Sequence, residues 1–531
     1  MMPPEGLRLM DMVREIPGQV DIVGDPEVRV HGVHHDSRRV EPGDLFVARH
    51  GANTDGTRFI PQAEERGAAA IMVERGHVDA DAGSIASVPH IVVDDATDAL
   101  AFASAAVYGH PTFTLDVIGI TGTNGKTTTS HLVRAAVDGA LAREREGAPA
   151  CGMIGTVGHI FGKMQIVAEH TTPEADEIAR VMNHMRQLGA THVAMEVSSI
   201  ALELGRVRAV RFRVAAFTNF TQDHLDFHGS MEAYAAAKER LFFDMGPGSA
   251  VIHIDDPLGR RIAERVRAPL LRVSARTGTP PEEAEIAPLE ATLDARGIDA
   301  TLRTPKGTHR VRSRLIGRHN LENIVVAVGV ACALDLELGR ACAAIGEESG
   351  VPGRLERCDV EADDVIALVD YAHTPDALAR VLESVRKVSG QGSRLVCIFG
   401  CGGDRDPKKR GPMGQAVADG ADIGILTSDN PRTEDPADIA RPVEEAVRAA
   451  GVPRAETVAA LQGLTRGYAV ELDRARAIRE TILAARPGDI VLVAGKGHED
   501  YQIIGTEKRP FDDRVEARNA LAERRRAQGK G

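Results

Sequence analysis

The last third of the chain has the clearest pattern of apolar and polar positions. Four apolar runs, at residues 365–369, 394–399, 423–426 and 490–493, each end in a polar or glycine-rich turn. Stretches with helical spacing, such as 375–387 and 439–449, lie between them. Apolar strands joined by helices predict a parallel sheet, whose ligand crevice lies at the carboxyl ends of the strands. A helix cap can explain any one of these turns, but four together favour a binding site.

The rest of the chain shows two further patterns of apolar and polar positions. Up to about residue 112, short apolar runs at 44–48, 68–73 and 90–93 alternate with charged turns, which predicts a small α/β domain. From 114 to about 350, strand-like runs at 117–120, 192–195, 214–217 and 250–254 are separated by helical stretches. Residues 275–312 are polar and weakly patterned, which predicts a hairpin or an insertion. We therefore expect an α/β protein with three domains, at 1–112, 113–351 and 352–531.

A glycine-rich turn follows the apolar run 115–120. It reads Gly122-Thr123-Asn124-Gly125-Lys126-Thr127-Thr128. Glycines let backbone N–H groups approach phosphate oxygens, a lysine neutralises β/γ charge, and a following threonine hydroxyl can hold Mg²⁺. The spacing is G-x-x-G-K-T, because the full G-x-x-x-x-G-K-T would need glycine where Ile120 stands. A chance glycine turn beside a lysine is the alternative, but the preceding strand and following threonines favour a nucleoside triphosphate site in a P-loop ATPase-like central domain.

Composition narrows the function classes. At 531 residues, with 43% hydrophobic and 27% charged positions, the chain is typical of a globular protein. A net charge of −13 argues against a nucleic-acid partner. We expect no membrane association, because no apolar run approaches the roughly 20 residues of a membrane helix and the start lacks signal-peptide features. The six cysteines form no C-x-x-C pair and fit a reduced, cytoplasmic protein.

Three further residues carry candidate chemistry. Glu196 ends the apolar run 192–195, where a carboxylate can complete the Mg²⁺ shell that Thr127 begins. His224, in Asp223-His224-Leu225-Asp226, is either a second metal ligand or an ordinary polar residue. Lys238 lies on an alanine-rich helix and looks ordinary by composition.

Taken together, these motifs resemble the Mur ligase family, the ATP-dependent amide-forming enzymes of peptidoglycan synthesis. The matching motifs run in order from Asp36-Ser37-Arg38 to Phe511-Asp512-Asp513-Arg514, and the shortened G-x-x-G-K-T loop is the family's own form. Within the family, the chain is most similar to the members that add 2,6-diaminopimelate. The resemblance implies a uridine-nucleotide domain, a central ATP-binding domain and a Rossmann-like C-terminal domain that binds the amino acid.

The resemblance also implies roles for individual residues. The P-loop residues 122–128 would bind ATP together with Asn323, Arg354, Asp370 and His373. The UDP-N-acetylmuramoyl-dipeptide would contact Ser37, Ala52, Asn53, Thr54, Thr171, Thr172, Ser198 and Arg206. Mg²⁺ would be held by Thr127, Glu196, His224 and Lys238. Lys238 matches a lysine that the family carbamylates, and CO₂ would turn this cation into an anion able to bridge toward Mg²⁺. The catalytic set would be Lys126, Glu196, His224 and Lys238.

The amino-acid site is the decisive part of the resemblance. The residues that match it are Arg405, Asp429, Asn430, Pro431, Arg432, Gly495 and Glu499. Diaminopimelate differs from lysine by a carboxylate at its far end. Arg432 offers that carboxylate a planar bidentate partner, and Glu499 can accept from the neighbouring ammonium. Lysine would leave Arg432 unpaired, and such sites can reject the analogue by about 10⁴-fold or more. An arginine that merely caps a helix is the plain alternative.

We therefore expect an ATP-dependent ligase that adds meso-2,6-diaminopimelate to the D-Glu γ-carboxylate of UDP-N-acetylmuramoyl-L-alanyl-D-glutamate through an acyl phosphate. Its partners would be these small molecules alone, and we expect a monomer. The alternatives are the same reaction with lysine or another diamino acid, a folyl-polyglutamate synthetase, and a P-loop switch protein. Two departures from the family pattern, Ile200 and Leu204, concern only the dipeptide contacts.

Overall fold

The protein is described here by a computed structural model that covers residues 6–51, 55–76, 86–348, 350, 353–390 and 392–529. The chain divides into two compact units. The first consists of Met1–Leu289, Leu302–Arg310 and Glu322–Ile345, and the second of Glu290–Thr301, Val311–Leu321 and Gly346–Gly531. The boundaries expected at residues 112 and 351 stay predictions.

The first unit begins with a five-stranded sheet in the order β2-β7-β6-β5-β4. Its strands are β2 (Val20–Val23), β4 (Val33–His34), β5 (Leu45–Ala48), β6 (Ala70–Glu74) and β7 (His90–Val93). Only β2 pairs antiparallel with its neighbour. Helices α1 (Leu9–Met12) and α3 (Ala96–Val107) pack on one face, and α2 (Ile60–Glu65) packs on the other. Two short strands of the same region, β1 (Leu7–Arg8) and β3 (Arg29–Val30), pair with each other in a separate antiparallel sheet.

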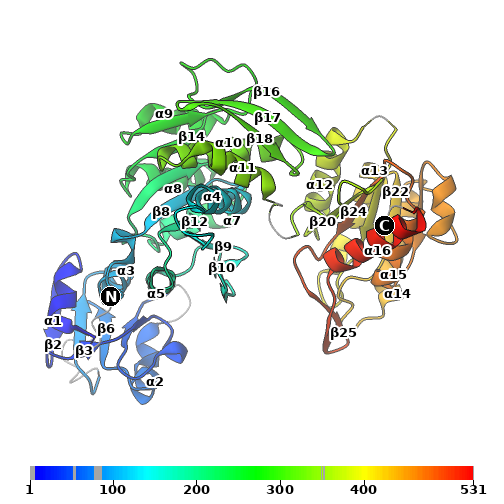
Figure 1. Cartoon of the computed structure of the whole chain (residues 1–531). Helices are drawn as coiled ribbons and strands as arrows, with labels where there is room; N and C mark the ends of the chain where they lie inside the picture. Colours follow the sequence, from blue (N-terminus) through cyan, green and yellow to red (C-terminus); the bar gives the residue numbers. More distant parts are fainter. Residues whose placement is uncertain are drawn as a thin grey trace. The chain divides into compact units, whose positions relative to one another are not determined.

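An eight-stranded sheet forms the centre of the first unit, in the order β11-β10-β9-β12-β8-β13-β14-β15 (Figure 1). Its strands are β8 (Asp116–Thr121), β9 (Cys151–Gly155), β10 (Gly158–Phe161), β11 (Met164–Ile166), β12 (His192–Glu196), β13 (Phe212–Phe217), β14 (Ala250–His253) and β15 (Leu270–Val273). Six of these strands are parallel to one another: β9, β12, β8, β13, β14 and β15. Because Ile120 pairs with Glu196 and Thr121 with Phe217, the carboxyl ends of β12, β8 and β13 lie at one edge.

Helices connect and cover the central strands. They are α4 (Lys126–Leu141), α5 (Ala175–Gln187), α6 (Ser199–Glu203), α7 (Leu225–His228), α8 (Met231–Phe243), α9 (Pro257–Arg265), α10 (Arg318–Ala333) and α11 (Leu338–Glu347). Residues of α5, α8 and α9 pack with alternate strand residues in one apolar core. The polar segment predicted to be a hairpin or an insertion, residues 275–312, contains all but the last residue of a separate three-stranded sheet. Its strands are β16 (Ala287–Asp294), β17 (Gly297–Thr304) and β18 (Gly307–Ser313).

The second unit contains a six-stranded sheet in the order β19-β20-β24-β21-β22-β23. The strands are β19 (Glu356–Arg357), β20 (Ile366–Asp370), β21 (Leu395–Phe399), β22 (Ile423–Leu426), β23 (Gly467–Val470) and β24 (Ile490–Ala494). All but β19 are parallel. Alternate strand residues enter two separate cores, one with α12 (Pro375–Val388), α13 (Arg410–Gly420) and α14 (Pro436–Ala449), the other with α15 (Arg474–Ala484) and α16 (Asp513–Ala527). A hairpin of β25 (Tyr501–Ile504) and β26 (Glu507–Pro510) follows β24 (Figure 1).

The expected α/β fold class is confirmed. The four apolar runs of the last third form β20, β21, β22 and β24, and the four turns follow the carboxyl ends of these parallel strands. All six cysteines are free. Within the described ranges, no helix has the length and apolar character needed to span a membrane.

Candidate functional site

The P-loop joins β8 to α4 in the first unit. Gly125 precedes the first residue of α4 with φ of +82°, and a side chain there would collide with Asn323. Lys126 turns back over the loop and its Nζ donates to the carbonyl oxygens of Gly122 (2.9 Å) and Thr123 (3.0 Å). Burial lowers the pKa of Lys126, and the charge of Glu196 opposes this effect. The loop therefore joins a strand to a helix N-terminus, as phosphate-binding loops do, and its role in binding ATP stays a prediction.

The segment after β13 fixes the shape of the P-loop. The Asn124 N–H donates to Asn219 Oδ1 (2.9 Å), and Thr218 Oγ1 donates to the Asn124 carbonyl (2.7 Å). His253 links this segment to Asp255. Its Nδ1 donates to the Thr218 carbonyl (2.8 Å), and its Nε2 lies 3.3 Å from the Asp255 carboxylate. Burial alone would lower the pKa of His253, but the Asp255 carboxylate outweighs it and raises that pKa.

Glu196 lies at the end of β12, next to the P-loop strand. Its carboxylate is only 1% exposed and accepts from Thr127 Oγ1 (2.9 Å) and from the N–H and hydroxyl of Thr156 (2.8 and 3.2 Å). Burial raises the pKa of Glu196, while Lys126 and these donors act in the opposite direction. Hydroxyl and carboxylate oxygens are ligands that Mg²⁺ prefers, usually together with phosphates and water. Among the described residues, no group of three His, Cys, Asp or Glu side chains forms a ready-made metal site.

Lys238 is buried although its helix looks ordinary in sequence. Its side chain is 1% exposed, and Nζ donates to the Gly122 carbonyl (2.8 Å), the oxygen that also accepts from Lys126. Burial, and then the charge of Lys126, lower the pKa of Lys238 well below its ordinary value. A lowered pKa favours the neutral, nucleophilic form of the amine.

Tyr234 links the P-loop to Lys238 and His224. Its hydroxyl lies 3.1 Å from Thr123 Oγ1, and its ring lies 4.5 Å from Lys238 Nζ. His224 adopts a left-handed backbone conformation, with φ of +49°, at the start of α7. Its exposed imidazole contacts the Tyr234 ring edge-on, with 6.1 Å between centroids, and lies 3.6 Å from Asp223. The structure therefore places His224 and Lys238 against the same aromatic ring.

Four of the residues expected to hold the dipeptide, Thr171, Thr172, Ser198 and Arg206, form a network around Glu196. Thr172 Oγ1 donates to the Glu196 carbonyl (2.9 Å) and accepts from the Ser198 N–H (2.9 Å). Arg206 donates to the Thr172 carbonyl (3.0 Å) and pairs with Glu174 (2.7 Å). Thr171 lies one residue away, with its hydroxyl 3.1 Å from the hydroxyl of Thr156.

Ser37 lies in a short helical turn between β4 and β5. Its Oγ donates to Gln62 Oε1 (2.7 Å), and the side chain of Asp36 caps this turn. Arg49, just after β5, pairs with Glu174 (2.9 Å), which also binds Arg206. Ala52, Asn53 and Thr54 lie outside the described residues.

In the second unit, the turns after β22 and β24 meet at a buried lysine. Lys496 is 0% exposed, and its Nζ donates to Asn430 Oδ1 (3.1 Å) and Glu499 Oε2 (3.0 Å) and lies 3.5 Å from Asp429 Oδ1. Asn430 Nδ2 donates to Glu499 Oε2 (3.1 Å). The fully buried ion pair of Arg474 and Asp513 (2.7 Å) supports the same edge of the sheet. Arg474 donates to the Ser428 carbonyl, just after β22, and to the Ala494 carbonyl, at the end of β24.

Arg432 projects from the same edge on a strained backbone. Its φ is +50°, and Nη1 donates to the Gly403 carbonyl in the turn after β21 (2.7 Å). The β25–β26 hairpin holds it, because the Arg432 N–H donates to Ile503 and its carbonyl accepts from Gly505. Gly495 has a φ of +123°, and Pro431 is buried beside Asn430. Arg405 is exposed in the loop after β21.

The nucleotide contacts expected from the second unit gather around Tyr371. Asp370 ends β20 and caps the neighbouring loops by accepting from the N–H groups of Leu355 (2.7 Å) and Ala372 (2.8 Å). Burial raises the pKa of Asp370. The Arg354 guanidinium lies 5.3 Å from the Tyr371 ring centroid, and His373 Nδ1 donates to the Tyr371 carbonyl (2.9 Å).

Comparison with known proteins identifies the family. Three family models match the chain: "Mur ligase family, catalytic domain" at residues 29–108, "Mur ligase middle domain" at 120–331, and "Mur ligase, glutamate ligase domain" at 353–497. The UDP-N-acetylmuramoyl-L-alanyl-D-glutamate–2,6-diaminopimelate ligase of Gloeobacter violaceus is 43% identical over 94% of this chain and 95% of its own. This chain belongs to the Mur ligase family.

Other Mur ligases agree over nearly the full length. The Geobacter metallireducens protein with the same name is 42% identical over 97% of this chain and 99% of its own. A solved structure of a 2,6-diaminopimelate ligase of this name is 30% identical, with a TM-score of 0.71, and covers 98% of this chain and 99% of that one. The resemblance seen in the motifs is thus confirmed.

Within the Mur ligase fold, the structure brings together most of the expected residues in two sets, one in each unit. The sequence reasoning missed several residues that organise them: Thr156, Tyr234, His253, Tyr371, Arg474 and Lys496. Lys496 lies between Gly495 and Glu499, which were both predicted, so its position in the turn after residues 490–493 was a usable signal. Burial of the others depends on packing between distant segments and leaves no comparable pattern.

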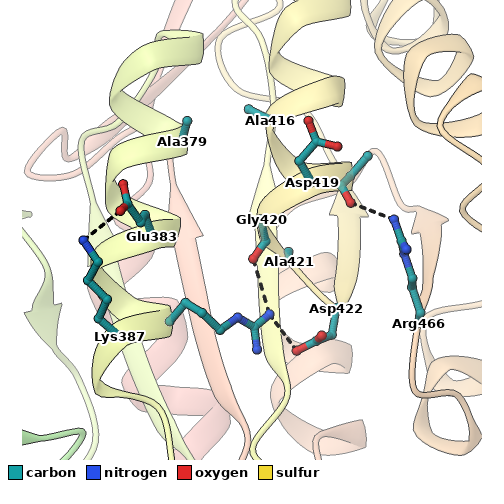
Figure 2. A pocket seen from close by; sticks show the side chains of 11 residues that line it. Ala379, Glu383, Lys387, Ala416, Asp419, Gly420, Ala421, Asp422 and Arg466 are labelled. Atoms are coloured by element: carbon teal, nitrogen blue, oxygen red, sulfur yellow. Dashed lines mark hydrogen bonds and ion pairs between the residues drawn. The ribbon is translucent and has the colours of Figure 1, made fainter.

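A separate surface pocket lies between α12 and α13 (Figure 2). It has a volume of about 530 Å³ and adjoins Asp422 and Arg466, which precede β22 and β23, so it lies at the amino ends of the strands. Four of its charged side chains are paired, Lys387 with Glu383 (2.7 Å) and Arg386 with Asp422 (2.9 Å), and Arg466 donates to the Ala418 carbonyl (3.0 Å). No predicted site residue of the Mur ligase lines it.

Proposed function

We propose that this chain is an ATP-dependent ligase that joins an amine of meso-2,6-diaminopimelate to the D-Glu γ-carboxylate of UDP-N-acetylmuramoyl-L-alanyl-D-glutamate. The observation that carries the proposal is its likeness, over nearly the whole chain, to ligases named for this reaction. The reaction is a step of peptidoglycan precursor synthesis. Its small-molecule substrates are the nucleotide-linked dipeptide, diaminopimelate and ATP.

The P-loop binds ATP. Backbone N–H groups at the start of α4 face the phosphates, and Lys126 stabilises the negative charge of the transferring phosphoryl group. The γ-carboxylate oxygen of D-Glu attacks the γ-phosphorus, the bond to the β–γ bridging oxygen breaks, and ADP leaves with that electron pair. The product is an acyl phosphate. The network of Thr172, Ser198 and Arg206 next to Glu196 supports placing the dipeptide beside the reacting phosphate.

Mg²⁺ fits the residues beside the P-loop. Thr127 and Glu196 would hold it, with His224 and a carbamylated Lys238 as further ligands, and the ion would neutralise charge on the phosphate oxygens. The lowered pKa of Lys238 supports the modification, because the neutral amine is the form that attacks CO₂. The resulting anion would also remove the repulsion between the two lysines that share the Gly122 carbonyl.

The second unit would bind diaminopimelate, whose free amine is the nucleophile. Glu499 and Asp429 would bind the distal ammonium of diaminopimelate, and Arg432 and Arg405 its carboxylates. The free amine attacks the acyl carbon, loses a proton, and expels phosphate from a tetrahedral intermediate. Asn323, Arg354, Asp370 and His373 are proposed nucleotide contacts.

The test is product formation. The purified protein is incubated with Mg²⁺, ATP and the nucleotide-linked dipeptide, with and without diaminopimelate, and ADP and the product mass are measured. We expect ADP release to depend on both acceptor and amine, with one tripeptide per ADP. ADP formed without an amide product would contradict the proposal and favour a nucleotide-dependent switch.

A further inference from the structure

A buried lysine lies among the residues proposed to read the amino acid. Lys496 is 0% exposed, and its ammonium contacts Asn430, Glu499 and Asp429 at 3.1, 3.0 and 3.5 Å. These four residues are called the Lys496 cluster below. The cluster belongs to the two turns that follow β22 and β24, so Lys496 joins turns that are far apart in sequence.

Lys496 determines how the Asn430 amide is oriented. Asn430 Oδ1 accepts from Lys496 Nζ and from the Ile503 N–H (2.9 Å), which leaves Nδ2 to donate to Glu499. Without the lysine, the Asn430 side chain would lose one of its two donors and could rotate. Glu499 would also lose its only cationic partner among the contacts described for it, and Asp429, which contacts the same lysine, would lose that charge as well.

The charges of the cluster match one end of a zwitterion. Two carboxylates and one ammonium give the Lys496 cluster a net charge of −1, which suits a single substrate ammonium. Arg474 lies behind the cluster, but its charge is balanced by Asp513 at 2.7 Å. Arg432, held by the Gly403 carbonyl and the β25–β26 hairpin, adds a positive charge that can pair with a carboxylate.

We propose that Lys496 is a positioning residue that sets the preference for diaminopimelate over lysine, by fixing Asn430 and Glu499 and holding the charge of the cluster at −1. The inference rests on the proposed function. Removing the ammonium makes the cluster −2, which opposes the distal carboxylate of diaminopimelate. Lysine carries only an ammonium at that end, so it loses less and discrimination falls.

The experiment compares kcat/KM for diaminopimelate and for L-lysine in the wild type, Lys496→Met and Lys496→Gln, with tripeptide products quantified by mass. Gln keeps a donor and most of the length but removes the charge. Lys508→Met is the matched control, because Lys508 is exposed and lies over the same Tyr501 ring that Lys496 approaches. Thermal unfolding of each variant reports whether it folds.

We expect Lys496→Met and Lys496→Gln to lower kcat/KM for diaminopimelate by about 100-fold, as for loss of one partner of a buried charge pair. KM for ATP and kcat/KM for lysine should change by no more than about twofold to threefold, as for distant or uncoupled changes. The diaminopimelate-to-lysine ratio then collapses, while Lys508→Met keeps it.

Equal losses with both amino acids would overturn the inference and make Lys496 a structural residue only. Failure of both Lys496 variants to fold, beside a stable Lys508→Met, would overturn it in the same way. A wild-type protein that makes no tripeptide would instead refute the proposed function, so the two failures are distinguishable.

Discussion

Replacing Lys238 tests the chemistry of the nucleotide site most sharply. The Gly122 carbonyl oxygen accepts from Lys238 Nζ at 2.8 Å and from Lys126 Nζ at 2.9 Å, which limits the separation of the two nitrogens to about 5.7 Å. With an effective dielectric constant of about 20, two positive charges at that distance repel by about 3 kcal/mol. Burial is the larger cause of the lowered pKa of Lys238, and this repulsion by Lys126 lowers it further. A neutral amine, open to carbamylation, relieves both effects.

We expect Lys238→Ala to lower kcat by about 10²- to 10³-fold, the usual effect of removing one preorganised group that stabilises the transition state. KM for diaminopimelate should stay within about twofold, since that site is formed by other residues. Formate or acetate should restore part of the activity by supplying an anion in the space left by the side chain. The assay is steady-state ADP release with all three substrates.

Lys387→Ala is the control, because Lys387 is an exposed lysine paired with Glu383 on the surface of α12. Its kcat should equal that of the wild type. Wild-type kcat in Lys238→Ala would refute the reasoning. Rescue by neutral formamide as strong as rescue by formate would show that the missing group is not an anion.

Three further predictions concern Arg432, Arg474 and Asp255. Arg432→Ala should lower kcat/KM for diaminopimelate by at least about 100-fold with KM for ATP unchanged, and equal losses for both ligands would contradict its role. Arg474→Met leaves Asp513, which is 0% exposed, without its partner, so urea denaturation should show a loss of about 3–5 kcal/mol; an unchanged midpoint would contradict this. Burial raises the pKa of Asp255, but His253 and Ser274 outweigh it and lower that pKa, so its stabilising effect is present above the ordinary carboxyl range and lost as pH falls through the folded-state value. Asp255→Asn should therefore lower stability at neutral pH and flatten the acid limb of the stability curve, which unfolding midpoints from neutral pH down to about pH 2 would measure.

Much of the fold was predictable because buried parallel strands appear as continuous apolar runs. The run at 423–426 coincides with β22, and the other three of the last third lie within one or two residues of their strands. The sequence pattern did not predict β9 and β10. The segment that forms β9, Cys151-Gly152-Met153-Ile154-Gly155, is short and mixes glycine with apolar residues. Strand β26 is fully exposed and β25 is a short, half-buried strand, so neither gives a continuous apolar run, and their pairing with each other and with Arg432 defines them.

The candidate site was predictable where a motif combines spacing with residue type, as in the P-loop and the turn 429–432. Burial was not. Lys238 stands among alanines like any surface lysine, yet packing of α8 against the P-loop places it at 1% exposure. Lys496 is similar, because its partners Asp429 and Asn430 come from a turn more than sixty residues away. A single sequence does not encode such pairings in any local pattern.

The central claim is that this chain adds diaminopimelate, and a direct competition tests it. The protein is given ATP, Mg²⁺ and UDP-N-acetylmuramoyl-L-alanyl-D-glutamate with equal concentrations of meso-diaminopimelate and L-lysine, and the two tripeptide products are quantified by mass. We predict that nearly all product contains diaminopimelate. A product that contains mainly lysine, or no product with either amino acid, would contradict the account.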